Sequence, residues 1–378
     1  MVCRRQNALK LLPLLLFVVL NVAVLHTVAQ VRPYDVPVRS LDLILFHCQP
    51  AFSGVVVIAQ AGKIKYARAA GMADIEKQKP VTIGGQFGGG SVCKQFTAVL
   101  VLQEMEKGRL SLGDTVGRYL PGLAMSWKDS VTVKQLLQHT SGVYAPDAPL
   151  AFTPGSSCLY SNYGYQLLGK IVERTSGKSF CEMASALFAR CGMTHTVDPA
   201  LCAGSPDSLV QSYLVQPNGK LQATDSILEL LNRIGEASGG IVTTAEDLVR
   251  WNECLHGGEL LHNDTYRMMW EPSRKIRQHP VFGEVSYGLS FPLQLHGRVH
   301  KICHSGLVGG SGFYCINFYY PDTKTSLVVM QHIGNESIPT TELFALQMAL
   351  ADTLEAKMRA AKTTTSLQKQ KIHAAPGR

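Results

Sequence analysis

The sequence predicts a mixed α/β fold (α+β in arrangement), in which an antiparallel sheet is flanked by helices beside a second, mainly helical lobe. Strand-like runs lie towards both ends of the chain, and helical patterns fill the middle. Short links join the successive late runs, which favours antiparallel pairing. The 378 residues, 46% of them hydrophobic, suffice for a large core. We therefore expect one domain over residues 40–355, with its sheet lobe at 40–90 and 238–355 and its helical lobe at 91–237.

The first 29 residues have the organisation of a secretory signal peptide. Arg4, Arg5 and Lys10 precede an apolar run over residues 11–25, and Thr27-Val28-Ala29 ends in a small residue suited to cleavage. The apolar run is shorter than the roughly 20 residues that a membrane-spanning helix needs. We expect cleavage near Ala29 and a secreted or periplasmic protein without a stable membrane span. An uncleaved segment would instead anchor the protein to a membrane.

The positive charge is concentrated at the two ends of the chain. The formal net charge of +8 comes from the basic N-terminal segment and from residues 356–378, which contain six basic residues and no acidic one. The remaining body is near neutral, which gives no indication of a nucleic-acid partner. We expect the basic tail at 356–378 to be disordered. Removal of the signal peptide would leave nine cysteines, so at least one thiol is free or forms an intermolecular bond.

The body of the chain divides into recognisable elements. A short helix is predicted at residues 41–47, and a hairpin at 53–60 and 63–70 that turns at Ala61-Gly62. Helices are predicted at 91–107, 131–138, 162–175 and 180–189, and Gly108 is expected to end the first of them. A capping box of Thr243 and Glu246 is expected to begin a helix that ends at Leu255. The remaining predicted elements are strands at 287–295, 298–303, 312–320 and 326–332 and a helix at 340–359.

The first candidate catalytic motif is Ser91-Val92-Cys93-Lys94, which follows three glycines and begins a long apolar helix. Three residues are nearly one helical turn, so the Ser91 hydroxyl and the Lys94 amine share a helix face. The helix N-terminus adds a partial positive charge beside Ser91. These features favour a serine nucleophile next to a lysine that accepts its proton. The spacing alone is weak evidence, because Ser366-Leu367-Gln368-Lys369 has it too.

The second stretch, Tyr160-Ser161-Asn162, stands at the start of the helix predicted at 162–175. A phenol beside Ser91 and Lys94 can relay protons if the lysine charge lowers the phenol pKa. The Asn162 side chain has a donor and an acceptor for a substrate amide. The alternative interpretation is a helix N-cap with a packed tyrosine.

The third stretch, His304-Ser305-Gly306, follows the strand predicted at 298–303. A strand beside the nucleophile can offer backbone N–H groups to an oxyanion. Gly306 would allow the substrate backbone to approach closely. His256-Gly257-Gly258 has the same spacing, but it lies where a helix is expected to end and is better explained as a C-cap.

Taken in order, these three stretches resemble the three motifs of the serine β-lactamase and penicillin-binding-protein superfamily. The tyrosine form of the middle motif is similar to that of class C β-lactamases, DD-peptidases, D-aminopeptidases and related esterases. Gln138-His139-Thr140-Ser141-Gly142 and Ser238-Gly239-Gly240 also agree with the family. The resemblance covers about residues 40–355. It implies a sheet flanked by helices plus a helical lobe, with the active site in the cleft between them.

The resemblance also implies a role for each motif residue. Ser91 is expected to be the acylated nucleophile, and Lys94 and Tyr160 are expected to share the general acid and base work. The N–H groups of Ser91 and Leu307 are expected to form the oxyanion hole. The residues expected to bind substrate are Asn162, His304, Ser305, Gly306 and Leu307.

Two positions depart from the penicillin-specific pattern. His304 stands where those members usually have lysine, and an unperturbed histidine, with a pKa of about 6.5, is mostly neutral at about pH 7. We therefore expect esters or D-amino acid peptides and amides to be preferred over carboxylate-bearing β-lactams, and β-lactam turnover to improve as His304 becomes protonated. Cys93 lies inside the first motif, where a bulky thiol reagent is expected to block the site.

The expected function is therefore a serine hydrolase that forms an acyl-enzyme on an ester or amide bond of a small molecule or peptide, with no metal or other cofactor. The alternative is a non-catalytic protein that binds penicillin or cell-wall peptides. A metal hydrolase and an α/β-hydrolase are poor alternatives, because neither H-E-x-x-H nor G-x-S-x-G occurs in the sequence. The residues leave the natural substrate and the oligomeric state open.

Overall fold

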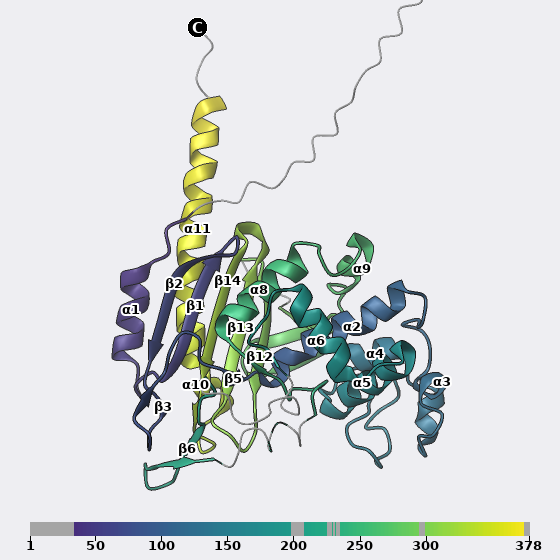
Figure 1. Cartoon of the computed structure of the whole chain (residues 1–378). Helices are drawn as coiled ribbons and strands as arrows, with labels where there is room; N and C mark the ends of the chain where they lie inside the picture. The colour runs from purple at the N-terminus through teal and green to yellow at the C-terminus, as the bar shows by residue number, and fades with distance from the viewer. Residues whose placement is uncertain are drawn as a thin grey trace, which may run out of the picture. The chain divides into compact units, whose positions relative to one another are not determined.

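The centre of the structure, a computed structural model that describes residues 34–197, 208–224, 229, 231, 235–294 and 299–373, is a five-stranded antiparallel sheet (Figure 1). Its strand order is β12-β13-β14-β1-β2. The first strands of the chain pair directly with the last, since Gly54 lies opposite Gln331 and Gln60 opposite Thr325. The two ends of the domain therefore form one sheet, as the sequence predicts. The strands are β1 (Gly54–Gln60), β2 (Lys63–Ala70), β12 (Ile302–Leu307), β13 (Tyr314–Tyr320) and β14 (Thr325–Gln331).

The three strands immediately before β12 form a separate sheet in the order β11-β10-β9. The single strand predicted at 287–295 is wrong, because the chain turns between Tyr287 and Pro292, where Ser290 has a φ of 89° and the Gly288 N–H donates to the Phe291 carbonyl over 2.9 Å. The predicted link after residue 295 lies outside the described residues. This sheet consists of β9 (Ile276–His279), β10 (Gly283–Tyr287) and β11 (Pro292–Gln294).

Short strand pairs fix several loops. The pairs are β3 (Met72–Asp74) with β4 (Lys79–Pro80), and β5 (Phe87–Gly88) with β8 (Val242–Thr243). A further group joins β6 (Tyr213–Val215) to β7 (Leu221–Ala223) and to β15 (Ile333–Gly334). The β5–β8 pair matters most for the site, because it holds the glycine run before Ser91 in place.

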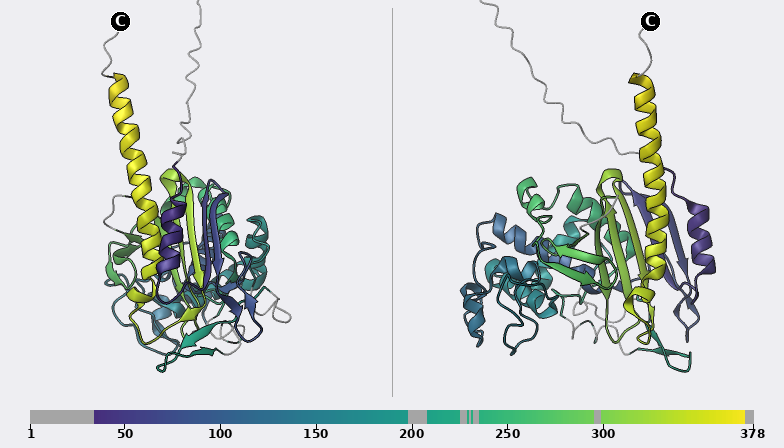
Figure 2. Two further views of the ribbon diagram at one scale, coloured as in Figure 1. Left: turned by 90° about the vertical axis from the view of Figure 1, so that its left-hand side faces the viewer. Right: turned by 180° about the vertical axis from the view of Figure 1, so that it is seen from behind.

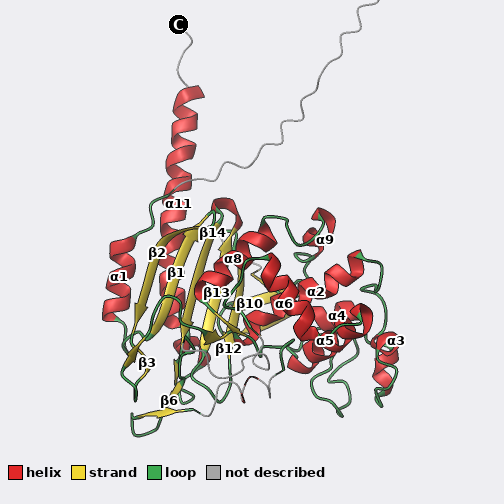
Figure 3. Cartoon of the chain, viewed as in Figure 1, coloured by secondary structure: helices red, strands yellow, loops and turns green. Residues whose placement is uncertain are grey.

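Helices pack on both faces of the central sheet (Figures 2 and 3). Every residue of β1, β13 and β14 is buried, as expected for strands covered on both sides. One face packs into a core with α2, α5, α6 and α8, and the other packs against α1 and α11. Side chains from both predicted lobes contribute to the first core, so the sheet lobe and the helical lobe share one apolar interior.

Most predicted helices are present, with ends that differ by a few residues. The helices on the helical side are α2 (Lys94–Glu106), α3 (Val116–Tyr119), α4 (Val133–Leu137), α5 (Asn162–Ser176), α6 (Phe180–Arg190), α8 (Ala245–His256) and α9 (Asn263–Met268). The other face has α1 (Val38–His47), α10 (Thr340–Leu343) and α11 (Ala345–His373). Three-residue and four-residue 3₁₀ turns lie at Gly90–Cys93 (η1), Ser126–Asp129 (η2) and Pro321–Thr323 (η4).

The predicted capping box at Thr243 is wrong by one residue. Thr244 is the N-cap of α8, and its hydroxyl accepts a hydrogen bond from the Asp247 N–H over 3.1 Å. Thr243 belongs to β8, where its hydroxyl lies 2.7 Å from that of Thr196. The helix ends at His256 with Gly257 as its C-cap, which agrees with the predicted role of that glycine.

The disordered tail predicted at residues 356–378 is wrong as far as residue 373, because α11 continues to His373, and the rest of it lies outside the described residues. No glycine or proline occurs between Ala345 and the proline at 376, and alanine, lysine, glutamine and leucine favour helix. Met358, two residues into the predicted tail, is buried against the sheet. The predicted signal peptide lies outside the described residues. Among the helices that are described, none combines the length and apolar character needed to cross a membrane.

Candidate active site

Ser91 lies in η1, the 3₁₀ turn that precedes α2, rather than in the α-helix itself. Gly90 adopts a φ of +52°, a conformation that favours glycine. A Cβ at Gly90 would lie 3.0 Å from the Leu307 backbone nitrogen, so the turn fits closely against β12. The glycine run therefore brings the half-buried Ser91 next to the strand that carries the third motif.

Lys94 is fully buried one turn after Ser91. Its Nζ lies 3.2 Å from the Ser91 hydroxyl oxygen, 2.7 Å from the Asn162 side-chain oxygen and 2.5 Å from the Ser238 carbonyl oxygen. No carboxylate contacts it in the described part of the chain, so burial disfavours its charged form. Burial lowers the pKa of Lys94 from 10.5 to about 7. The amine can therefore exist in its neutral form near neutral pH.

Tyr160 comes from the loop before α5, and Lys94 Nζ lies 4.8 Å from the centre of its ring. The expectation that the lysine charge lowers the tyrosine pKa is wrong. The Tyr160 hydroxyl is buried and makes no hydrogen bond of normal geometry, and burial raises its pKa well above 10. The nearby Ser91 hydroxyl offsets this effect only in part. Tyr160 is therefore a neutral phenol beside the serine and lysine.

Asn162 begins α5 immediately after the N-cap Ser161, whose hydroxyl accepts a hydrogen bond from the Gly164 N–H over 2.8 Å. Ser161 is thus the helix N-cap of the alternative interpretation, and substrate binding by Asn162 stays a prediction. The Asn162 side-chain oxygen is engaged by Lys94. Its amide nitrogen is the group left to contact a substrate.

His139 is a positioning residue whose role the sequence did not reveal. It is completely buried and has a φ of 58°. The centre of its ring lies 4.3 Å from the ring centre of Tyr160 and 5.1 Å from that of Tyr165. Its Nδ1 accepts a hydrogen bond from the Ser161 N–H over 3.1 Å. Burial lowers its pKa well below 6.5, so the imidazole is neutral. His139 thus fixes the position of the second motif through its contacts with Ser161 and Tyr160.

The third motif lies on β12, directly against the glycines that precede Ser91. A Cβ on Gly306 would lie 2.3 Å from the Gly89 carbonyl oxygen and 2.8 Å from the Cys315 sulfur. The glycine is therefore required for the approach of the chain's own backbone, and not only for a substrate. Ser305 is half-buried and Leu307 is 43% exposed, so the end of this strand reaches the surface. All three motifs meet at one place.

His304 differs from its expected behaviour. The side chain is buried, and its Nδ1 donates to the Ser305 carbonyl oxygen over 2.8 Å. Burial lowers the pKa of His304 to about 3, an effect that the Ser305 carbonyl opposes only in part. The expectation that His304 becomes charged just below neutral pH is therefore wrong. The imidazole is therefore neutral near neutral pH.

Cys93 is also unlike its expected role. The thiol is fully buried, 4.0 Å from the Ile241 carbonyl oxygen, and burial raises its pKa to about 12. A bulky thiol reagent therefore cannot reach the Cys93 sulfur, and the sulfur is not present as the reactive thiolate. The cysteines that are free thiols in the described part of the chain include Cys48, Cys93, Cys158, Cys191, Cys254, Cys303 and Cys315.

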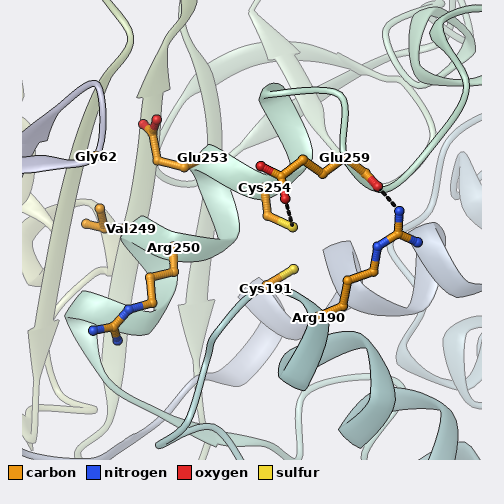
Figure 4. A pocket seen from close by; sticks show the side chains of 8 residues that line it. All are labelled: Gly62, Arg190, Cys191, Val249, Arg250, Glu253, Cys254 and Glu259. Atoms are coloured by element: carbon orange, nitrogen blue, oxygen red, sulfur yellow. Dashed lines mark hydrogen bonds between the residues drawn. The ribbon is translucent and has the colours of Figure 1, made fainter.

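A pocket of about 260 Å³ lies apart from the motif residues, between the end of α6 and α8 (Figure 4). Its lining includes Arg190, Cys191, Glu253 and Cys254, and none of the motif residues. The Cys191 and Cys254 side chains point towards one another. The Cys254 thiol donates a hydrogen bond to the Glu259 carboxylate over 3.8 Å. Within the described ranges, no group of three or more histidine, cysteine or acidic side chains is arranged to hold a metal ion.

Comparisons with known proteins show the family and the fold of this chain. The family model described as Beta-lactamase matches residues 45–346. Penicillin-binding protein 4* of Bacillus subtilis (strain 168) is 26% identical over 318 residues, which cover 74% of this chain and 68% of that protein. Protein flp of Staphylococcus aureus (strain N315) is 23% identical over 311 residues, which cover 75% of this chain and only 60% of that protein.

Among solved structures, the D-amino acid amidase from Ochrobactrum anthropi SV3 has the same fold, with a TM-score of 0.72 and 21% identity. The match covers 84% of this chain and 98% of the amidase. The antiparallel sheet with helices is thus a shared fold. The two curated relatives above are longer than the part that this chain matches.

Proposed function

This chain belongs to the β-lactamase family, and on that basis we propose that it is a serine hydrolase in which Ser91 forms an acyl-enzyme with an ester or amide substrate. The observation that carries the proposal is the 3.2 Å separation between Lys94 Nζ and the Ser91 hydroxyl oxygen, combined with a lysine pKa of about 7. A neutral amine at that distance can take the serine proton.

The proposed reaction begins when the Ser91 oxygen attacks the substrate carbonyl carbon while its proton moves to Lys94 Nζ. The N–H groups of Ser91 and Leu307 would bind the oxygen that becomes negatively charged. The neutral Tyr160 phenol would then donate its proton to the leaving group and recover a proton from Lys94. Attack by water on the acyl-enzyme, with the same groups in reverse, would release the acid and restore Ser91.

We propose esters and amides, including D-amino acid derivatives, as better substrates than penicillins and cephalosporins. A carboxylate placed against β12 would meet a neutral, buried His304 rather than a cation, so it would lose charge-assisted hydrogen bonds there. The amidase of similar fold supports an amide substrate. Export through a cleaved signal peptide remains part of the proposal, and sequencing of the mature N-terminus tests it.

The proposal is tested with a fluorophosphonate probe and a p-nitrophenyl ester. Mass spectrometry should place the probe on Ser91, and Ser91→Ala should lose both the label and ester turnover. Ser366→Ala is the matched control, because Ser366 has the same spacing to a lysine within α11 and should not matter. Label that persists in Ser91→Ala would refute the proposal. Label on Ser91 without any turnover would indicate the non-catalytic binding protein instead.

A further inference from the structure

The three motifs provide no permanent positive charge for a substrate. Lys94 directs its amine at three acceptors of the protein itself, and its pKa of about 7 leaves it only partly charged. His304 is neutral. An anionic substrate group would therefore gain little from these residues, and a cation elsewhere in the site would decide whether such a group is accepted.

Arg277 is a cation beside the site that no motif includes. It lies on β9 opposite Val285 of β10, and its side chain is half-buried. Its guanidinium carbon lies 5.2 Å from the centre of the Tyr160 ring, and its Nη1 lies 3.5 Å from the Tyr287 hydroxyl. Burial has the largest effect on the pKa values of Tyr160 and His139, and the Arg277 charge also acts on both groups in the lowering direction. Arg277 is thus electrostatically part of the site.

The guanidinium has no acidic partner in the part of the chain that the structure describes. The two nearest candidates along the sequence are engaged elsewhere: Glu271 pairs with Lys134 at 3.8 Å, and Glu284 accepts from Gln278 over 3.2 Å. A guanidinium has five N–H donors, and among the described residues the hydrogen bond recorded for Arg277 is the long one to the Tyr287 hydroxyl. A half-buried arginine with donors to spare is suited to bind a carboxylate through two parallel hydrogen bonds.

We propose that Arg277 binds a carboxylate of the substrate, so that the enzyme selects esters or amides that carry a negative charge on the Tyr160 side of the site. This inference rests on the proposed function. It does not conflict with poor use of β-lactams, because the expected β-lactam carboxylate position is against His304, whereas Arg277 contacts Tyr160. The carboxylate can belong to the acyl group or to the leaving group, since both are bonded to the carbonyl carbon that Ser91 attacks.

Two matched pairs of substrates distinguish these sources. For the acyl group, the pair is the p-nitrophenyl monoester of adipic acid and its terminal amide. For the leaving group, it is 3-carboxyphenyl acetate and 3-carbamoylphenyl acetate. The two members of each pair have nearly the same shape and differ in charge and in hydrogen-bonding groups. The readout is the ratio of kcat/KM for the carboxylate to kcat/KM for the amide.

In at least one pair, the wild type should favour the carboxylate, and Arg277→Gln should lower the ratio by about 10-fold to 100-fold, as expected for hydrogen bonds to a charged group. Arg277→Lys should lower it less, because the charge remains but the paired geometry is lost. Arg267→Gln, which changes an exposed arginine on α9 paired with Asp264, should leave the ratio unchanged. A ratio that Arg277→Gln does not change in either pair overturns the proposal. An equal loss of kcat/KM for both members of a pair is one such unchanged ratio, and it would indicate that Arg277 packs against Tyr160.

Failure of the proposed function has a different signature. If the wild type hydrolyses none of the four esters, serine hydrolase activity fails, and the role of Arg277 is measured by calorimetry with adipate, adipamide, 3-hydroxybenzoate and 3-hydroxybenzamide. At least one carboxylate should then bind the wild type more tightly than its amide, and Arg277→Gln should remove that difference. Equal affinities for both members of each pair in the wild type overturn the carboxylate site.

Discussion

Raising the pH from 6 to 8 should increase the rate of Ser91 acylation by about tenfold, with a midpoint near pH 7 and a plateau above it. Lys94 accepts the serine proton only as a neutral amine, and burial lowers its pKa to about 7. The neutral fraction then rises from about one tenth at pH 6 to about nine tenths at pH 8. A lysine at its ordinary value of 10.5 would instead give a rise of about 100-fold and no plateau.

The assay is kcat/KM for an uncharged p-nitrophenyl ester between pH 5 and 9, with Ser91→Ala as the blank for spontaneous hydrolysis. Tyr160→Phe should be slower but should keep the midpoint near 7, because the tyrosine pKa lies far above this range. A rise that continues to pH 9 without a plateau would refute the assignment of Lys94 as the base. So would a midpoint that disappears in Tyr160→Phe.

Three further predictions follow from burial around the site. Gly306→Ala should lower the free energy of unfolding by about 1–3 kcal/mol, because the new Cβ would lie 2.3 Å from the Gly89 carbonyl oxygen. Urea unfolding measures this loss, with Gly309→Ala as the control, since a Cβ at Gly309 would have no neighbour within 4 Å. An equal loss in both variants would contradict the steric reason. Cys93 in the native protein should resist a bulky maleimide, and modification found there by peptide mapping would show that the turn opens. The His304 imidazole should stay neutral above about pH 4, given its pKa of about 3, and an inflection between pH 6 and 7 in its NMR titration would disprove its burial.

The central sheet could be predicted because its strands carry strong local signals. The hairpin at 53–70 has a β-branched run and a turn at Ala61-Gly62, and β13 and β14 are joined by a short loop. The strand β9 has weaker signals, since its side chains alternate between exposed and half-buried positions. The extension of α11 was missed because charge suggested disorder, whereas helix propensity and the burial of Met358 decide the outcome.

The proximity of the motif residues could be predicted from the sequence, but their electrostatics could not. The spacing of Ser91 and Lys94 and the order of the motifs are properties of the sequence, and the structure brings these residues together. The pKa values of Tyr160 and His304 depend on burial, which no local pattern reveals. Arg277 gives no signal in the sequence either, because a single arginine on a short strand becomes relevant only when folding places it over Tyr160.

The most direct test of the central claim is to trap the acyl-enzyme. A p-nitrophenyl ester with a bulky acyl group is mixed with the protein, quenched in acid within milliseconds and analysed by intact mass and peptide mapping. We expect a mass increase equal to one acyl group, located on Ser91 and absent from Ser91→Ala. Product formation with no acylated protein, or an acyl group on any other residue, would contradict it.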